Sequence, residues 1–286
     1  MAVPVTDEAW VRQNFAALSD VRHVGTGGQK SVFRAKHPTD GDVVLKAILK
    51  PSSDERISRE ILAVQTVSSL RVPKIFETGT VGQTVWIREQ CVTGDSLRAR
   101  LRKADRLKYA DLLRLQEQVL DALHAAEAKK IVHRDVKPDN IMCDVDGSFW
   151  LLDFGLARFI EMESLTATGP FGGVGTAGYA PEEQYRNKKK EIDGRADLFA
   201  LGVTLWESHN GAHPFTVGAR DFFEVARRIE GSPPARLAIV GDDGNELSAM
   251  IATFMHRRRD YRPSSVKEAL DWTRDLIRRR SVSASG

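Results

Sequence analysis

Three side chains with hard donor atoms lie close together in the middle of the chain. Asp135 and Asn140 belong to the segment IVHRDVKPDNIM, and Asp153 follows in FWLLDFGLAR. Short apolar stretches of the kind that form buried strands flank them. Carboxylate and amide oxygens are the ligands that Mg²⁺ prefers, and substrate phosphates commonly complete its shell. The pattern therefore predicts a magnesium-phosphate site.

A glycine-rich segment near the N-terminus, VGTGGQKSVF, could cover such phosphates. Gly25 and Gly27 stand where a side chain would hold the backbone N–H groups away from an anion, and Gly28 keeps the turn pliable. Lys30 occupies the third glycine position of a G-x-G-x-x-G pattern. Either Lys30 points to solvent or it adds a cation near the terminal phosphate. Taken alone, the segment fits an ordinary hairpin equally well.

A small sheet and a set of helices are predicted to position these residues. From residue 21 to 86 the pattern is strand-like, with the apolar runs VVLKAIL and TVWIREQCV and one helix, DERISREILAVQTVSSL, between them. Helical spacing dominates from residue 110 onward. We expect an α+β fold with an N-terminal β-sheet lobe at about 21–92 and a larger, mainly α-helical C-terminal lobe at about 93–279. Residues 1–20 would be an N-terminal extension and 280–286 a disordered tail.

Length and composition fit one two-lobed protein of ordinary globular type. The 286 residues are 42% hydrophobic and 28% charged, and 42 basic against 39 acidic residues leave a net charge of +3. This balance gives no reason to expect nucleic acid as the main partner. The two cysteines have no metal-binding spacing, and no apolar run reaches the ~18 residues of a membrane span. We expect a cytoplasmic protein with no membrane partner.

Several motifs occur together in the order and spacing of one family: a lysine strand, a helix glutamate, HRDVKPDN, DFG and a downstream APE string. The sequence resembles a eukaryotic-type (Hanks-type) serine/threonine protein kinase, and is more similar to bacterial members than to animal ones. The resemblance implies a bilobal protein kinase fold over residues 21–279. It also implies transfer of the γ-phosphate of ATP, with Mg²⁺ or alternatively Mn²⁺, to serine or threonine hydroxyls of a protein substrate.

The resemblance assigns the catalytic and metal-binding roles. Asp135 would be the catalytic base, and Lys137 would lie near the transferred phosphate. Asn140 and Asp153 would hold the metal ions.

It also assigns Lys46 to the α- and β-phosphates, with Glu60 as its ion-pair partner. Glu60 lies three residues after Ile57 and four before Val64, on the edge of an apolar helical stripe where an unpaired carboxylate would be costly. A surface glutamate at the margin of that stripe is the alternative.

The nucleotide is expected to contact residues of both lobes. Val32, Val44 and Met142 would pack on adenine, and the backbone of Glu89 to Cys91 would bond to it. The alignment puts Arg88 at the gatekeeper position, which is usually apolar, and a buried arginine there would need a partner that the sequence does not name. The full set predicted to bind the nucleotide is Gly25, Gly27, Gly28, Val32, Val44, Lys46, Glu89, Cys91 and Met142.

Further residues are expected to support the structure. Read literally, the APE string makes Glu182 the buried partner of Arg262; read without a gap, it makes Glu183 that partner. Asp197 would brace the catalytic loop, which contains His133 as a packed member and Arg134. His209, His213 and His256 are predicted to be surface or capping residues.

A regulatory segment lies between Asp153 and the APE string. Arg134 would supply a guanidinium to pair with a phosphate there, so autophosphorylation is expected at one or more of three hydroxyls: Ser164, Thr166 and Thr168. Exposed hydroxyls with no regulatory role are the alternative. A regulatory partner protein is a further candidate source of the activating signal.

Two other functions compete with that of an active protein kinase. Lys30 and Arg88 favour an ATP-binding pseudokinase scaffold. A small-molecule phosphotransferase would share the lobes and an H-x-D-x-x-x-x-N site, but would normally lack the long activation segment, the APE string and Arg262.

Overall fold

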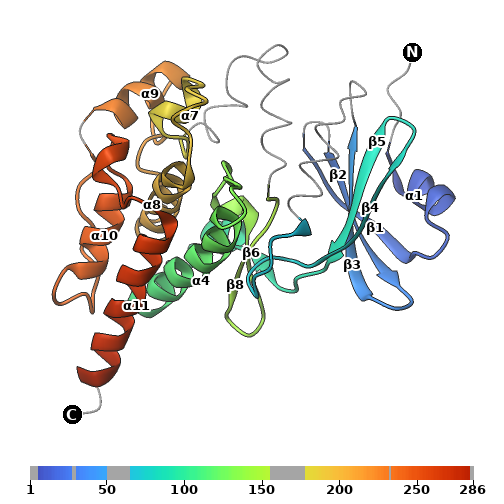
Figure 1. The fold of residues 1–286 in the computed structure, drawn as a ribbon, viewed down its shortest axis with the longest axis horizontal. Helices are drawn as coiled ribbons and strands as arrows, with labels where there is room; N and C mark the ends of the chain where they lie inside the picture. Colours follow the sequence, from blue (N-terminus) through green and yellow to red (C-terminus); the bar gives the residue numbers. More distant parts are fainter. Residues whose placement is uncertain (1–5, 28–29, 50–64, 155–177, 232, 284–286) are drawn as a thin grey trace. The chain divides into compact units, whose positions relative to one another are not determined.

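A computed structural model describes residues 6–27, 30–49, 65–154, 178–231 and 233–283 (Figure 1). The chain divides into two compact units: residues 1–68 with 73–92, and residues 69–72 with 93–286. The first unit contains a five-stranded sheet and the second is mainly helical. The predicted α+β class is therefore confirmed.

The sheet of the first unit is antiparallel, with the strand order β1-β2-β3-β5-β4. In β2, buried and more exposed residues alternate, as expected when one face packs against a core, whereas four consecutive residues of the central strand β3, from Leu45 to Ile48, are buried. The strands are β1 (Ser19–Gly27), β2 (Lys30–His37), β3 (Gly41–Leu49), β4 (Ile75–Val81) and β5 (Thr84–Gln90).

One face of this sheet is covered by helix α1 (Glu8–Asn14). The Asp7 carboxylate caps the helix by accepting the Trp10 backbone N–H at 2.8 Å. Val11 is fully buried in a cluster that includes Phe33 and Leu45 of the strands, and burial of such side chains is worth about 1.5–3 kcal/mol each. The predicted N-terminal extension thus supplies part of the core of the sheet unit.

The helical unit is organised around α8 (Gly194–Asn210), which packs against α4 (Tyr109–Glu127), α10 (Glu246–Phe254) and α11 (Val266–Ser283). Apolar side chains are buried around most of the α8 surface, as expected for a central helix. The helix begins at an Asp193 cap and ends at Gly211, which has a φ of 82°. The other helices are α3 (Leu97–Arg102), α7 (Glu182–Tyr185) and α9 (Phe222–Glu230), with short 3₁₀ turns η1 (Pro138–Asn140) and η2 (Arg259–Tyr261).

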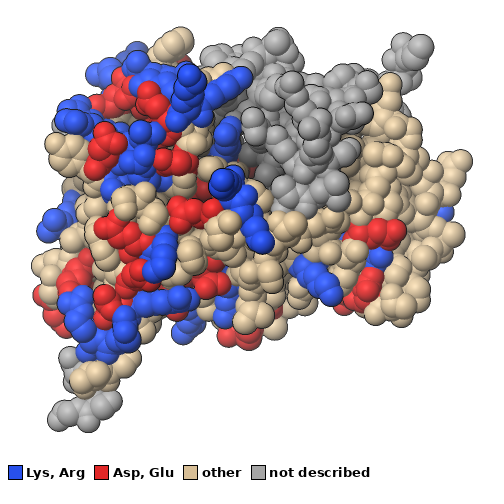
Figure 2. Space-filling view, in the orientation of Figure 1, with Lys and Arg blue, Asp and Glu red and all other residues tan. Residues whose placement is uncertain are grey.

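A second, three-stranded sheet lies in the helical unit, in the order β6 (Asp95–Ser96), β7 (Ile141–Cys143) and β8 (Phe149–Leu151). It holds η1 at one end of β7 and Asp153 just beyond β8. Figure 2 shows acidic and basic side chains interleaved over the helical unit, as the near balance of charges predicts. Within the described ranges, the helices are too short or too polar for any of them to cross a membrane.

Candidate functional site

Asp135 is held by two neighbours in its own loop. The Asn140 side-chain amide donates to Asp135 Oδ2 at 2.7 Å and to the Asp135 carbonyl at 2.8 Å. Lys137 Nζ lies 2.7 Å from Asp135 Oδ1. Side-chain exposure of 25% leaves the carboxylate open on one side. Asp135, Lys137 and Asn140 are therefore brought together, as predicted.

Asp197 fixes the backbone of the same loop from α8. Its two carboxylate oxygens accept the backbone N–H groups of His133 at 2.8 Å and Arg134 at 2.7 Å. Burial raises the pKa of the Asp197 carboxyl, while the nearby charges and these N–H groups oppose the rise. Arg134 has a φ of 67°, a conformation that costs energy for a residue with a side chain and needs such support. Its carbonyl accepts a bond from the Gln184 amide at 2.7 Å.

His133 joins this loop to the segment that carries Asp153. Its Nδ1 accepts the Asp135 backbone N–H at 3.2 Å, so the ring proton is on Nε2, which donates to the Leu152 carbonyl at 2.7 Å. The ring also packs edge-on against Phe154 with centroids 4.6 Å apart. His133 is fully buried and already bonded through both nitrogens, which agrees with its prediction as a packed member of the loop.

Asn140 and Asp153 carry donor atoms that suit a magnesium ion. The Asn140 nitrogen is directed at Asp135, so the amide oxygen is the atom that remains for a metal. Asp153 contributes a carboxylate and has a φ of 62°, a second left-handed residue in this region. An amide oxygen and a carboxylate form an all-oxygen set, and nucleotide phosphates would complete it.

In the sheet unit, Lys46 lies on the face opposite α1. Direct cross-strand partners point to the same face, and the row through Lys46 contains Gly25, Val32 and Ile87. The next row contains Val44 and Glu89 and lies on the same face. Val32 and Val44 are half-buried.

A buried carboxylate of the same sheet pairs with Lys46. The Lys46 Nζ lies 2.5 Å from Glu89 Oε1, and the two side chains are 4% and 9% exposed. We predicted that Glu89 would act through its backbone, but its residue lies inside the sheet, with Val44 and Ile75 as partners on either side. Its side chain is the group directed toward Lys46. The predicted partner Glu60 lies outside the described residues.

Arg88 does not share the face of Lys46. It pairs with Leu45 across the strands and therefore points to the α1 side of the sheet. There its guanidinium forms ion pairs with Asp40 and, at 2.9 Å, with Glu77. These acids are the partners that the sequence did not name, and the expectation of an arginine gatekeeper beside Lys46 was wrong.

The other residues predicted to contact the nucleotide include two glycines of β1, Cys91 and Met142. A Cβ built on Gly25 would meet no atom of the described residues within 4 Å, so packing against them does not explain the glycine. The Cys91 backbone N–H donates to the Asp42 carbonyl at 3.3 Å, which uses one of the groups expected to face adenine. Gly27 ends β1 opposite Lys30, and Met142 lies in β7. Gly28, Ser164, Thr166 and Thr168 lie outside the described residues.

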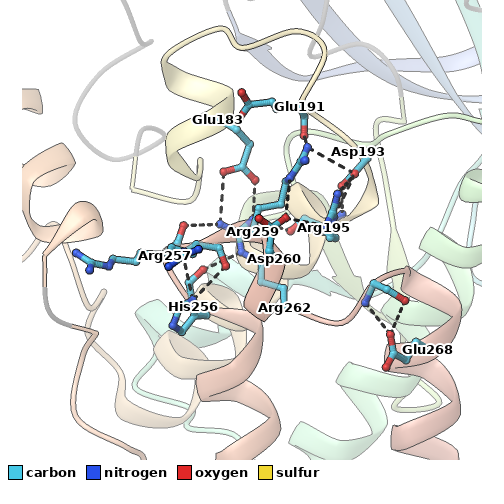
Figure 3. Close-up of polar contacts among 12 residues, drawn as sticks. Glu183, Glu191, Asp193, Arg195, His256, Arg257, Arg259, Asp260, Arg262 and Glu268 are labelled. Atoms are coloured by element: carbon cyan, nitrogen blue, oxygen red, sulfur yellow. Dashed lines mark hydrogen bonds and ion pairs between the residues drawn. The ribbon is translucent and has the colours of Figure 1, made fainter.

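Glu183, and not Glu182, is the buried partner of Arg262. The Arg262 Nη1 lies 2.6 Å from Glu183 Oε1, and the remaining guanidinium donors bond to the carbonyls of Arg195, His256 and Arg257 (Figure 3). Glu182 pairs instead with Lys188 at 3.0 Å near the surface. The prediction of Glu182 is therefore corrected, because its side chain lies on the outer side of the short helix α7 and Glu183 on the inner side.

A second buried polar cluster, formed by Arg98, Tyr179, Glu207 and His213, was missed from the sequence. Arg98 bonds to Glu207 at 2.6 Å and to the Tyr179 hydroxyl at 2.7 Å, and that hydroxyl also donates to Glu207. Burial raises the pKa of Tyr179. No short-range motif joins residues separated by 81 and 109 positions, so only the fold reveals this cluster.

His213 packs edge-on against Tyr179 and is 8% exposed, so of the two predicted alternatives the surface position is wrong and the capping role holds. Its Nδ1 accepts the backbone N–H groups of Phe215 and Thr216 at 3.1 and 3.2 Å. Burial lowers the pKa of His213 to about 4.

Comparison with known proteins gives a consistent picture. Residues 18–272 match the model of the protein kinase domain. The chain is 30% identical over 275 residues to the serine/threonine-protein kinase PknF of Mycobacterium tuberculosis, covering 92% of this chain and 56% of the relative. It is 29% identical over 234 residues to PknD of the same species, covering 79% of this chain and 35% of that kinase.

A third relative, the serine/threonine-protein kinase PknL of Mycobacterium bovis, is 29% identical over 248 residues, or 83% of this chain and 61% of the relative. The chain thus spans between about a third and three fifths of the length of these curated relatives. With most of its length matched and its motifs in place, the chain belongs to the protein kinase domain family, among relatives named as bacterial serine/threonine kinases.

Proposed function

We propose that this chain is an ATP-dependent serine/threonine protein kinase. The observation that carries this proposal is the loop around Asp135, whose carboxylate is oriented by Asn140 and Lys137 and whose backbone is fixed by Asp197. A group held in this way before substrate arrives is suited to proton transfer, since little reorganisation is required in the transition state. The partial exposure of the carboxylate leaves room for a hydroxyl.

The protein residues would divide the reaction between them. Asp135 accepts or orients the proton of the substrate hydroxyl as its oxygen attacks the γ-phosphorus and the bond to the β-phosphate oxygen breaks. Lys137 stabilises negative charge on the transferred group, and Lys46 holds the α- and β-phosphates. A divalent metal, Mg²⁺ or Mn²⁺, would be held by Asn140 and Asp153 and would neutralise phosphate charge when bound.

The same loop supports selection of serine and threonine over tyrosine. Lys137 lies two residues after Asp135 and contacts its carboxylate, the arrangement that the resemblance associates with serine/threonine kinases. The relatives carry serine/threonine-protein kinase names, which supports a protein substrate. A regulatory partner protein, a cytoplasmic location and autophosphorylation at Ser164, Thr166 or Thr168 stay predictions.

The experiment is intact-mass spectrometry of phosphatase-treated protein incubated with Mg²⁺ and ATP, beside an Asp153→Asn variant. We expect steps of one phosphate in the wild type and none in the variant, and peptide mapping would test the three proposed hydroxyls. Transfer to a generic protein substrate is measured in parallel. Absence of both autophosphorylation and transfer, in protein that binds ATP, would contradict an active kinase.

That outcome would favour the pseudokinase scaffold, the second candidate. One of its two supports is weaker in the structure, because Arg88 points away from the face of Lys46 and has acidic partners of its own. Lys30 is the support that remains. A small-molecule phosphotransferase is disfavoured by the buried Glu183–Arg262 pair, which belongs to the protein-kinase motif set.

A further inference from the structure

The ion pair between Lys46 and Glu89 is unusual for a lysine that serves phosphate binding. Both side chains are almost fully buried, and the 2.5 Å contact joins neighbouring strands of one sheet. Burial strengthens the attraction between the charges, and loss of one partner would leave the other charge in a poorly solvated place. The pair is therefore an established part of the sheet unit.

The strand register shows where the ammonium group of Lys46 lies. Lys46 is opposite Ile87, whereas Glu89 is opposite Val44, one same-face row further along β3 and β5. The lysine side chain must consequently extend along the strand, from its own row to the row of Val44. That row contains Val44, one of the residues expected to contact adenine, so Glu89 draws the cation away from its own row.

We infer that Glu89 is a counter-ion that competes with nucleotide phosphates for Lys46 and thereby sets the affinity for nucleotide. This inference rests on the proposed phosphate-binding role of Lys46. In the free protein, the carboxylate of Glu89 offsets the charge of Lys46. Phosphates that bind Lys46 must overcome this contact and also approach a fixed negative charge. Glu89 is thus a positioning residue that acts through Lys46.

Glu89→Gln should lower thermal stability and at the same time raise the affinity for ADP. The amide has the same shape and still accepts a hydrogen bond, but it reduces the negative charge beside Lys46 by one. Without nucleotide, the buried ammonium loses a charged partner, and we expect the melting temperature to fall by about 3 °C or more. With ADP, the more available ammonium should bind phosphate more tightly, by about 10-fold in Kd. A residue with a merely structural role would not tighten binding.

The experiment measures Kd by calorimetric titration of adenosine, ADP and ATP into wild-type protein and Glu89→Gln, without divalent metal. Tighter binding should appear for ADP and ATP but not for adenosine, because adenosine has no phosphate. Glu77→Gln is the matched control. Glu77 lies on β4, its carboxylate pairs with Arg88 of β5, and it points to the opposite face of the sheet. It should leave all three affinities unchanged. If Glu89→Gln does not fold, Glu89→Met removes the same charge.

Each other outcome overturns the inference. A change of equal size for adenosine would make Glu89 a contact of the base, and weaker ADP binding would make it a group that holds Lys46 ready for phosphate. Unchanged affinities would make the pair purely structural. Wild-type protein that binds neither ADP nor ATP would overturn the proposed function itself, a result distinct from wild-type binding that Glu89→Gln fails to tighten.

Discussion

The two units hold their charged residues in different ways. In the helical unit, Asp197 accepts backbone N–H groups and Arg262 donates to three carbonyls besides Glu183. In the sheet unit, Lys46 is paired with the side chain of Glu89 on an adjacent strand. Backbone partners cannot be exchanged without unfolding, whereas a side-chain counter-ion can be displaced by a ligand. Under the proposed function, we therefore expect the chemical step to depend on the backbone-held loop and nucleotide affinity to depend on the side-chain contact.

The largest expected effect is on the helical unit's chemistry. Asp135→Asn preserves an oxygen that can accept from Asn140 but removes the proton acceptor, so turnover should fall by about 10²- to 10⁴-fold. Steady-state kinetics with ATP and a protein substrate would measure this loss, beside calorimetric ADP affinity. Asp139→Asn, four residues on and paired with Arg98 near the surface, is the control and should retain turnover. An equal loss in both variants would indicate disruption of the loop.

The next effect tests how firmly the helical unit depends on its buried pair. Glu183→Ala leaves the Arg262 guanidinium buried without its carboxylate, and the free energy of unfolding should fall by about 3–5 kcal/mol. Glu182→Ala, which removes a surface pair with Lys188, should cost less than about 1 kcal/mol. Urea unfolding followed by circular dichroism and fluorescence would compare them. Similar losses would return Glu182 to the structural role.

A third effect concerns pH and the missed cluster. The pKa of His213 is about 4 in the folded protein and near its ordinary 6.5 when unfolded, so the unfolded state binds the proton first as pH falls. Wild-type stability should therefore decrease between pH 6.5 and 4, by at most about 3 kcal/mol from this group. His213→Asn keeps an acceptor for the Phe215 N–H but does not titrate. Its unfolding free energy should fall less over the same range, and an unchanged slope would contradict the assignment.

The smallest effect on stability is expected in the sheet unit. Gly25→Ala adds a Cβ at a point where the described part of the chain has no atom within 4 Å, so unfolding free energy should change by less than about 1 kcal/mol. ADP affinity should nevertheless fall by roughly threefold or more, because the new methyl group would lie in the proposed phosphate-binding segment. Gly79→Ala should lower the unfolding free energy and leave ADP affinity unchanged, since its Cβ would lie 2.6 Å from the Trp86 ring. Thermal unfolding and ADP titration of both variants separate the two outcomes, and intact ADP affinity in Gly25→Ala would remove this glycine from the site.

Local contacts of the site could be read from the sequence, because they join residues a few positions apart. The contacts that Asp135 makes with Lys137 and Asn140 belong to one short segment with a strong motif. The fold class was likewise predictable, since a long region with strand periodicity is followed by a long region with helix periodicity. Asp197 was placed through the family resemblance, over a separation of 64 residues.

The errors arose where the direction of one side chain was decisive. A shift of one residue along a strand moves a side chain to the other face, so Arg88 and Glu89 exchange places when the alignment slips by one. Glu182 and Glu183 pose the same difficulty at the start of α7. Burial of His213 involves packing against Tyr179, which is distant in the sequence, and no local pattern marks it.

Helix α1 has a consequence for the limits of this domain. The family match starts at residue 18, yet Val11 fills the core on the back of the sheet beside Phe33 and Leu45. The family match and the packed core of the sheet unit therefore begin at different residues. Separation of this short helix from the sheet, for example by proteolysis in the connection after Asn14, would turn interior surface into an adhesive apolar patch. Helix α1, which precedes the residues matched by the family model, thus shields this apolar face of the sheet from contact with other molecules.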